Sequence, residues 1–263
     1  MAGHEILVGQ IDPASDRAVF RQIADHLREA IEGGRLSPGD KLPSEAALMQ
    51  HYNVARMTVR HAMQELQGEG LAVAEHGRGV FVRSRPPVKR LASDRFARRH
   101  RKEGKAAFIA ESEVVGAKAS VDMIDVREGS PLPEIAERLK VRADEAVVIR
   151  SRRYSLDGRP VELATSYIPA DLALGTRIMD ANPGPGGIYA RLEEQGRTLD
   201  RFTEDVFTRM PTREEARLLL LAPGVPVFRL IRTAYDLDGR SVEVCDTIMS
   251  GDAYQLSYEL PAH

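Results

Sequence analysis

Hydrophobic residues recur at helical spacing in the first third of the chain and at strand-like spacing in much of the rest. The first amphipathic helix is indicated by five hydrophobic positions with charged residues between them: Val19, Phe20, Ile23, Leu27 and Ile31. It is expected to end at Gly33-Gly34. Runs such as 146–150 and 225–229 are rich in β-branched residues and predict strands. The pattern therefore predicts an α+β protein.

A second and a third helix follow, separated by a tight turn. Ser44 is a good N-cap, and Glu45 suits the positive end of a short helix that reaches about His51. Asn53 tolerates the left-handed conformation that a tight turn needs. The third helix is predicted from about Ala55 to Glu69. Its core-facing positions are expected to be Val59, Met63 and Leu66, with Val54 just before them, and its outward positions Arg56, Arg60, His61 and Gln64.

A short hairpin is predicted after the third helix. Two apolar strands, at about 71–74 and 80–82, surround the glycine-rich tip Gly77-Arg78-Gly79. Glycines let a backbone approach a DNA duplex closely, and Arg78 can enter a minor groove or meet a phosphate. An ordinary hairpin with an exposed arginine would show the same residues.

Arginine placement on the third helix indicates DNA recognition. Arg56 and Arg60 are four residues apart, so they share one face in the first two turns. This part of a recognition helix reaches base edges in the major groove, where arginine can contact guanine or a phosphate. A solvated helix face is the alternative for this helix alone. The order of helix, turn, helix and hairpin favours the DNA-binding interpretation.

Residues 17–83 resemble the winged helix-turn-helix of the GntR family of bacterial transcription regulators. The resemblance rests on Leu42-Pro43-Ser44-Glu45, on Arg56-Met57-Thr58-Val59-Arg60, on Leu66 with Glu69-Gly70-Leu71, and on Gly77-Arg78-Gly79 with Phe81-Val82. It implies operator contacts by Ser44, Glu45, Arg56, Met57, Thr58, Arg60, His76, Gly77, Arg78 and Gly79. The chain departs from the family pattern at Ala46, often arginine, and at Met57, often a hydroxyl residue. Met57 can touch a thymine methyl instead.

Positive charge is concentrated between the two halves of the chain. Residues 84–105 hold 9 Lys and Arg against 2 Asp and Glu, whereas residues 1–83 hold 9 against 11. With Pro86-Pro87, this segment is expected to be a basic linker and hinge that attracts phosphates. A solvated helix, or residues that face an effector pocket, are the alternatives.

The second half contains a weak internal repeat. Residues 154–162 and 235–243 correspond at an offset of 81, and each copy has Asp-Gly at a predicted hairpin turn. A helix-like segment precedes each hairpin, at 132–139 and 212–221, and a third lies at 187–194. Two copies of helix plus hairpin predict one antiparallel sheet with pseudo-twofold symmetry.

This half resembles the UTRA effector-binding domain of the HutC subfamily, whose fold is like that of chorismate lyase. The resemblance covers about 106–260 and rests on four phrases: Arg150-Ser151-Arg152, the hairpin 157–162, Ser166-Tyr167-Ile168-Pro169 and Gly251-Asp252-Ala253-Tyr254. It implies effector contacts by Arg150, Arg152, Glu162, Tyr189 and Glu243. Arg150 and Arg152 are two apart on a strand, so they point to one face and need anions. The alternative is structural ion pairing of these arginines with Glu162 and Glu243. Met249 and Ser250 depart from the family's usual Tyr and Arg.

Length and composition set the remaining limits. A chain of 263 residues suits two domains, here 1–83 and 106–263 joined by 84–105. One cysteine argues against a disulfide framework, and no apolar run suits a signal peptide or a membrane span. We therefore expect a cytoplasmic protein with no cofactor, no metal and no enzymatic activity. The predicted function is a homodimeric repressor that leaves a pseudo-palindromic operator when it binds a small anionic effector, either a phosphorylated sugar or an organic acid. The alternative is a ligand-independent repressor, for example of a plasmid or integrative-element transfer system, whose second domain only dimerises.

Overall fold

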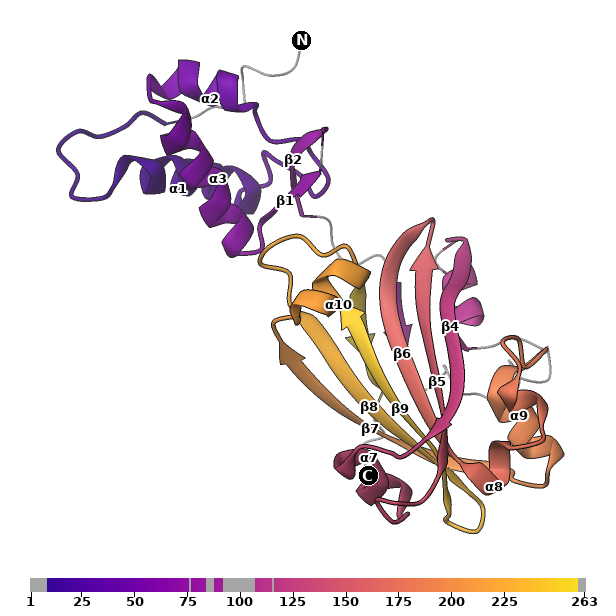
Figure 1. Ribbon diagram of the computed structural model, residues 1–263. Helices are drawn as coiled ribbons and strands as arrows, with labels where there is room; N and C mark the ends of the chain where they lie inside the picture. The colour runs from indigo at the N-terminus through magenta and orange to yellow at the C-terminus, as the bar shows by residue number, and fades with distance from the viewer. Residues whose placement is uncertain (1–8, 76, 84–87, 92–106, 115, 260–263) are drawn as a thin grey trace. The chain divides into compact units, whose positions relative to one another are not determined.

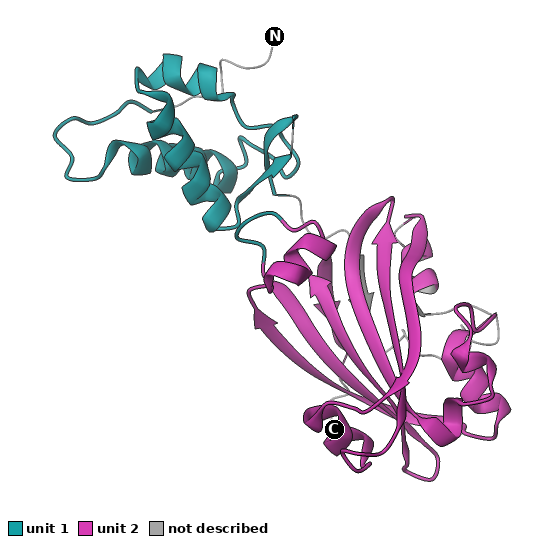
Figure 2. Cartoon of the chain, viewed as in Figure 1, with its two compact units in different colours: residues 1–85, 222–225 teal, residues 86–221, 226–263 magenta. Residues whose placement is uncertain are grey.

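The computed structural model divides the chain into two compact units. Unit 1 comprises residues 1–85 and 222–225, and unit 2 comprises 86–221 and 226–263 (Figure 2). The residues that the structure describes are 9–75, 77–83, 88–91, 107–114 and 116–259. The predicted domain boundaries at 83 and 105 stay a prediction, because residues 84–87 and 92–106 lie outside this description.

Unit 1 is a three-helix domain with a two-stranded wing, as the hydrophobic pattern predicts (Figure 1). Its elements are α1 (Val19–Glu32), α2 (Glu45–Tyr52), α3 (Arg56–Gly68), β1 (Ala72–Glu75) and β2 (Gly79–Val82). The strands pair antiparallel, with Ala72 opposite Val82. Apolar faces of all three helices meet in one core, in which Ile23, Leu48 and Leu66 are fully buried. Burial of these faces, rather than helix propensity, holds such short helices in place.

The turn between α2 and α3 forms as the sequence predicts. The Ser44 hydroxyl accepts a hydrogen bond from the amide of Ala47 at 3.2 Å and so caps α2. Asn53 follows α2 in the left-handed conformation, with φ of 50°. The chain then reverses and begins α3 at Arg56. This geometry fixes which residues stand in the first turn of α3.

Unit 2 is built on a six-stranded antiparallel sheet (Figure 1). Its strands, in spatial order, are β4 (Ala119–Gly129), β5 (Val147–Leu156), β6 (Arg159–Pro169), β9 (Ser241–Ser250), β8 (Val227–Asp236) and β7 (Leu199–Arg209). Among its described residues, the helices are α6 (Ala107–Val114), α7 (Pro133–Leu139), α8 (Ala170–Ala173), η1 (Arg177–Met179), α9 (Gly187–Glu194) and α10 (Arg213–Leu218). The α+β class, the antiparallel sheet and the three predicted helical segments are confirmed.

The sheet consists of two similar halves, β4-α7-β5-β6 and β7-α10-β8-β9, which meet at β6 and β9. The predicted offset of 81 residues holds for β6 and β9 but not for β5 and β8. Ala164 of β6 corresponds to Cys245 of β9 at an offset of 81. Ala164 pairs with Arg152 and Cys245 pairs with Arg232, so the offset between these two arginines is 80. The second hairpin turn has one residue more, and the Asp236 carboxylate stabilises it by accepting from the amides of Asp238 and Arg240. Arg152 therefore corresponds to Arg232.

Helices cover both faces of this sheet. On one face, Ile135 and Leu139 of α7 pack against Ile149, Tyr167 and Ile231. On the other face, Tyr189 and Leu192 of α9 pack against strand residues that include Val148, Ile168, Ala234 and Val242. Because strand residues alternate between faces, Arg150 and Arg152 share the α9 face with Val148.

Part of the predicted linker is a strand. β3 (Val88–Leu91) pairs in parallel with β10 (Tyr254–Ser257) near the end of the chain. The remaining predicted hinge residues, 84–87, and the rest of the basic segment, 92–105, lie outside the described residues.

Candidate DNA-binding and effector sites

The first turns of α3 present a polar, exposed surface. The Arg56 and Arg60 side chains are 69% and 52% exposed, and Met57 is 57% exposed. Thr58 is half-buried beside them, while Val59 on the opposite side of the helix is fully buried. Two cations and one apolar side chain therefore stand together at the N-terminal end of a helix whose other face is fixed in the core.

Glu45 of α2 lies between the two arginines of α3. The Nε of Arg56 donates to Glu45 Oε2 at 2.6 Å, and the Nε of Arg60 lies 3.8 Å from Glu45 Oε1. Exposed pairs of this kind contribute little to stability. Their effect is to hold two flexible side chains on one face.

The wing tip adds two more cations. Gly77 and Gly79 have φ of 72° and 123°, which side chains rarely tolerate. Arg78 between them is exposed, pairs with Glu75, and stacks its guanidinium over the Phe81 ring at 5.3 Å. Lys41, which the sequence analysis did not assign, lies over the same ring at 5.9 Å. Lys41 pairs with Phe81 through a single β-bridge, a tertiary contact that no sequence motif predicts. His76 lies outside the described residues.

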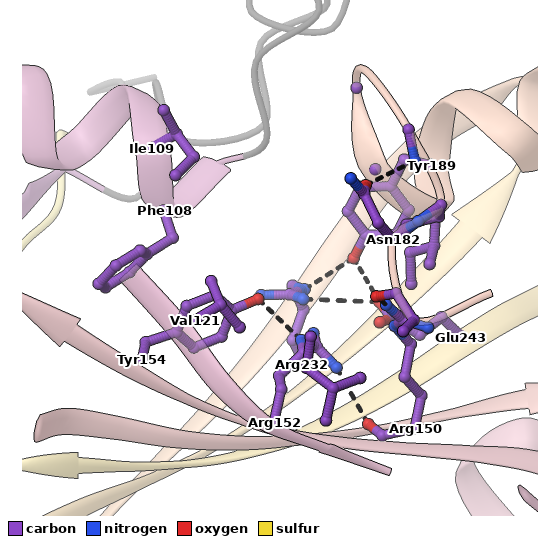
Figure 3. Close-up of a pocket in the computed structure, with 17 residues that line it drawn as sticks. Phe108, Ile109, Val121, Arg150, Arg152, Tyr154, Asn182, Tyr189, Arg232 and Glu243 are labelled. Atoms are coloured by element: carbon purple, nitrogen blue, oxygen red, sulfur yellow. Dashed lines mark hydrogen bonds and ion pairs between the residues drawn. The ribbon is translucent and has the colours of Figure 1, made fainter. Parts of the chain in front are cut away.

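Unit 2 encloses a cavity of about 410 Å³ on the α9 face of its sheet (Figure 3). Four of the five predicted effector residues line it: Arg150, Arg152, Tyr189 and Glu243. Arg232, which the sequence analysis did not assign, lines it as well. This size suits a small molecule.

The guanidinium of Arg150 is held by main-chain oxygens. Its Nη1 donates to the carbonyls of Ile178 and Asp180 at 3.3 and 2.5 Å, and its Nη2 donates to the carbonyl of Ala181. The residue is only 4% exposed. Burial, with repulsion from Arg152, lowers the pKa of Arg150 below its ordinary value. The arginine nevertheless stays charged, so its environment favours an incoming anion.

Arg152 and Glu243 belong to one buried hydrogen-bond network. Arg152 donates to Tyr154 Oη at 2.7 Å and to Ser166 Oγ at 2.9 Å, and Ser166 donates to Glu243 Oε1 at 2.6 Å. Tyr189 donates to Glu243 Oε2 and receives a hydrogen bond from Arg232 Nε at 3.0 Å. Burial raises the pKa of the Tyr189 hydroxyl well above its ordinary value, so Tyr189 stays a donor.

The structural ion pair in this network differs from the predicted alternative. Arg232 pairs with Glu243 at 3.5 Å, whereas the side chains of Arg150 and Arg152 bond to main-chain carbonyls, hydroxyls and the Cys245 sulfur. Glu162 does not line the cavity. It is buried elsewhere and accepts a hydrogen bond from the Tyr254 hydroxyl at 2.9 Å. Glu162 pairs with Tyr154 on β5, which lines the cavity, so it shares that face of the sheet, but it lies where the C-terminal strand β10 (Tyr254–Ser257) supplies its partner.

Family models match both parts of the chain. The model of the UTRA domain matches residues 115–255, and that of bacterial regulatory proteins of the gntR family matches residues 20–82. The chain belongs to the GntR family. Within this GntR-family regulator, the first match contains the six-stranded sheet and all the cavity-lining residues except Phe108 and Ile109 of α6, and the second contains α2, α3, the wing and nearly all of α1. The chain is therefore a DNA-binding transcriptional regulator with an effector-binding domain.

Relatives of this regulator span nearly its full length. The HTH-type transcriptional regulator SCO4628 of Streptomyces coelicolor is 33% identical over 246 residues, which are 91% of each chain. The HTH-type transcriptional repressor NagR of Bacillus subtilis is 26% identical, over 93% of this chain and 95% of its own. A crystal structure of a GntR-family transcriptional regulator superposes with a TM-score of 0.64 at 28% identity, covering 94% of this chain and 99% of that one. Within its described residues, this chain forms no helix with the length and apolar character needed to cross a bilayer.

Proposed function

We propose that this regulator is a repressor that binds its operator as a homodimer and leaves it when an organic anion occupies the cavity of unit 2. Three buried or half-buried arginines around one cavity are the observation that supports the proposal. NagR, and the mannosyl-D-glycerate system repressor MngR of Escherichia coli at 26% identity, are both named repressors. We infer that this chain acts in the cytoplasm and catalyses no reaction.

At the operator, we propose that α3 enters the major groove and the wing approaches the adjacent minor groove. Arg56 and Arg60 would contact bases or phosphates, Met57 a thymine methyl, and Thr58 a phosphate. Ser44 and Glu45 would contact the operator from the start of α2. Gly77, Arg78 and Gly79 would contact it from the wing tip. A homodimer would place one α3 in each half-site of a two-fold symmetric sequence.

In the cavity, we propose that Arg150 and Arg152 hold the anion while Tyr189 and Glu243 orient its environment. An effector can shift a regulator only if it binds the released and the DNA-bound arrangements with different affinity. A ligand that draws Arg150 away from the carbonyls of Ile178, Asp180 and Ala181 changes what holds segment 178–181. This gives the ligand a structural difference to act on.

The test is operator release by the full chain. An operator is first obtained by selection from random duplexes, and binding is then measured with a panel of organic acids and sugar phosphates. Arg150→Ala should keep operator affinity within about twofold, because this residue lies in unit 2, yet it should lose the response to the effector. The proposal fails if the wild-type chain binds no specific duplex, or if Arg150→Ala is still released at the same effector concentration.

A further inference from the structure

The cavity of unit 2 has two chemically different ends (Figure 3). Arg150, Arg232 and Glu243 lie at one end, with Asn182 and Tyr189 beside them. Phe108, Val121 and Tyr154 lie toward the other, and the lining there continues with apolar side chains. A single small molecule that fills about 410 Å³ must satisfy both ends.

The apolar end is walled by two elements. Phe108 and Ile109 come from α6, and Val121 and Ile124 come from the edge strand β4. The Phe108 ring packs against the Tyr154 ring with centroids 4.4 Å apart. Apolar walls of this kind favour a ligand with an apolar surface, because such a surface leaves water on binding without giving up hydrogen bonds.

A bulge in β4 brings a second side chain of this strand, Ile124, to the apolar end. Residues three apart on a regular strand point to opposite faces, yet Val121 and Ile124 both line the cavity. The register shifts between Asp122 and Asp125, and Met123 takes a left-handed conformation with φ of 51°. A bulge re-aims side chains in this way, and a non-glycine residue in that conformation is strained. The fold therefore tolerates strain where it brings Ile124 to the cavity.

The polar end offers charge but few acceptors for ligand hydroxyls. Glu243 accepts from Ser166 on one oxygen and from Tyr189 and Arg232 on the other. Asn182 Oδ1 accepts from the amide of Gly184 at 2.9 Å. A sugar carries several hydroxyls, each of which needs an acceptor for its proton and a polar surrounding. Among the lining side chains at the apolar end, the Tyr154 hydroxyl is polar, and it already accepts a hydrogen bond from Arg152.

The positive charge at the polar end of the cavity favours an anionic ligand. The cavity is lined by three guanidinium groups and one carboxylate, and Glu204, opposite Arg232 on β7, adds a second carboxylate nearby, so a net positive charge remains among these groups. Arginine binds carboxylates in a bidentate fashion, which uses two of its donors at once. From these two ends we propose that the effector is a carboxylic acid with an apolar, ring-sized or alkyl body, and not a phosphorylated sugar. This inference rests on the proposed effector role of the cavity.

The experiment uses the full chain, measuring thermal stabilisation and then affinity by calorimetry. The probes are 4-phenylbutyrate, octanoate, the uncharged 4-phenylbutyramide, glucose 6-phosphate and acetate. An apolar acid should raise the melting temperature with saturation and bind at least about tenfold more tightly than its amide, glucose 6-phosphate or acetate. Tighter binding of glucose 6-phosphate than of both apolar acids overturns the inference, and so does equal binding of the acid and its amide.

Variants place the binding at the apolar end. Ile124→Asn should weaken the binding of the better apolar acid by about tenfold. Val206→Thr on the other edge strand, β7, is the matched control and should leave it within about twofold. Ile124 and Val206 are 38% and 39% exposed, so neither change should unfold the chain, and circular dichroism verifies this. Unchanged affinity in a folded Ile124→Asn variant also overturns the inference.

The two proposals fail in different ways. If glucose 6-phosphate binds and releases the operator, the effector role of the cavity stands and only the apolar-acid inference is wrong. If none of the five probes binds and the wild-type operator complex ignores all of them, the inference is wrong for this cavity. The wider acid and sugar-phosphate panel then decides the effector role by itself.

Discussion

Arginine serves two different surfaces in this regulator. On α3, the Arg56 and Arg60 side chains are more than half exposed and share one partly exposed carboxylate, Glu45. In the cavity, Arg150 and Arg232 are only 4% and 5% exposed and are held by main-chain carbonyls, Tyr189 and Glu243. The same guanidinium group therefore meets water in one unit and a largely dry network in the other.

This difference in exposure determines how strongly a substitution at each surface affects stability. An exposed guanidinium keeps its hydration and can exchange one partner for another, which suits a protein that must slide along phosphates before it meets its operator. A buried guanidinium has lost its hydration, so each missing partner destabilises the fold. Substitutions in unit 1 should therefore change DNA binding with little effect on stability, and substitutions in the cavity network should change stability as well.

The largest effect is expected at Glu243. Glu243→Gln removes the charge that Arg232 pairs with and places an amide donor against Ser166, Tyr189 or Arg232. Breaking a buried ion pair on one side typically costs about 3–5 kcal/mol, and the free energy of unfolding of unit 2 should fall by that order. Denaturant titration followed by circular dichroism measures it.

An exposed ion pair provides the control for this prediction. Asp144→Asn breaks the pair of Arg142 and Asp144, whose side chains are 78% and 79% exposed, and should leave the free energy of unfolding nearly unchanged. Equal losses for Glu243→Gln and Asp144→Asn would remove the distinction between buried and exposed arginines.

A smaller effect, confined to DNA binding, is expected at Arg56. Arg56→Ala should weaken operator binding by about 1–3 kcal/mol if the guanidinium reads a base, and the free energy of unfolding should barely change. Arg21→Ala on α1 removes a similarly exposed arginine, 57% exposed, and serves as the control. Titration of labelled operator and of a scrambled duplex measures both affinities. Equal loss on the two duplexes would make Arg56 a phosphate contact instead.

How much the sequence could predict differs between the same two surfaces. The DNA-binding face depends on residues close together in the chain, so helical spacing, the Ser44 cap and the turn at Asn53 were enough to place Arg56 and Arg60. The cavity depends on pairing between distant strands. A single extra residue in the second hairpin turn moves the counterpart of Arg152 from 233 to Arg232, and a one-residue shift on a strand reverses the face of every side chain. An offset read from the hairpin alone therefore missed Arg232.

The same reasoning explains Glu162 and Ile124. Glu162 and Glu243 occupy equivalent positions in the repeat, but Glu243 is the one that contacts α9, because the connection that carries α9 follows β6, whereas the described residues after β9, 251–259, contain β10. The bulge that turns Ile124 inward has no sequence signal comparable to a glycine. The internal repeat predicted the sheet. The cavity depends on the features in which the two copies differ: the longer second hairpin turn, the connection that carries α9 and the bulge in β4.

The smallest effect in free energy is expected at Glu45, where it would sharpen the comparison most. Glu45→Gln releases Arg56 and Arg60 from a shared carboxylate and removes a negative charge from the proposed DNA-binding face. Stability should change by less than about 1 kcal/mol. Binding to a scrambled duplex should strengthen, and the slope of log affinity against log salt should steepen by roughly one, because one more phosphate contact is neutralised. The ratio of operator to scrambled affinity should fall, since the guanidinium groups are less firmly directed. Glu29→Gln on α1 makes the same charge change at another exposed position and should leave that ratio unaltered. If Glu45→Gln also preserves the ratio of operator to scrambled affinity, Glu45 does not direct the two exposed arginines. The recognition surface is then less preorganised than the cavity.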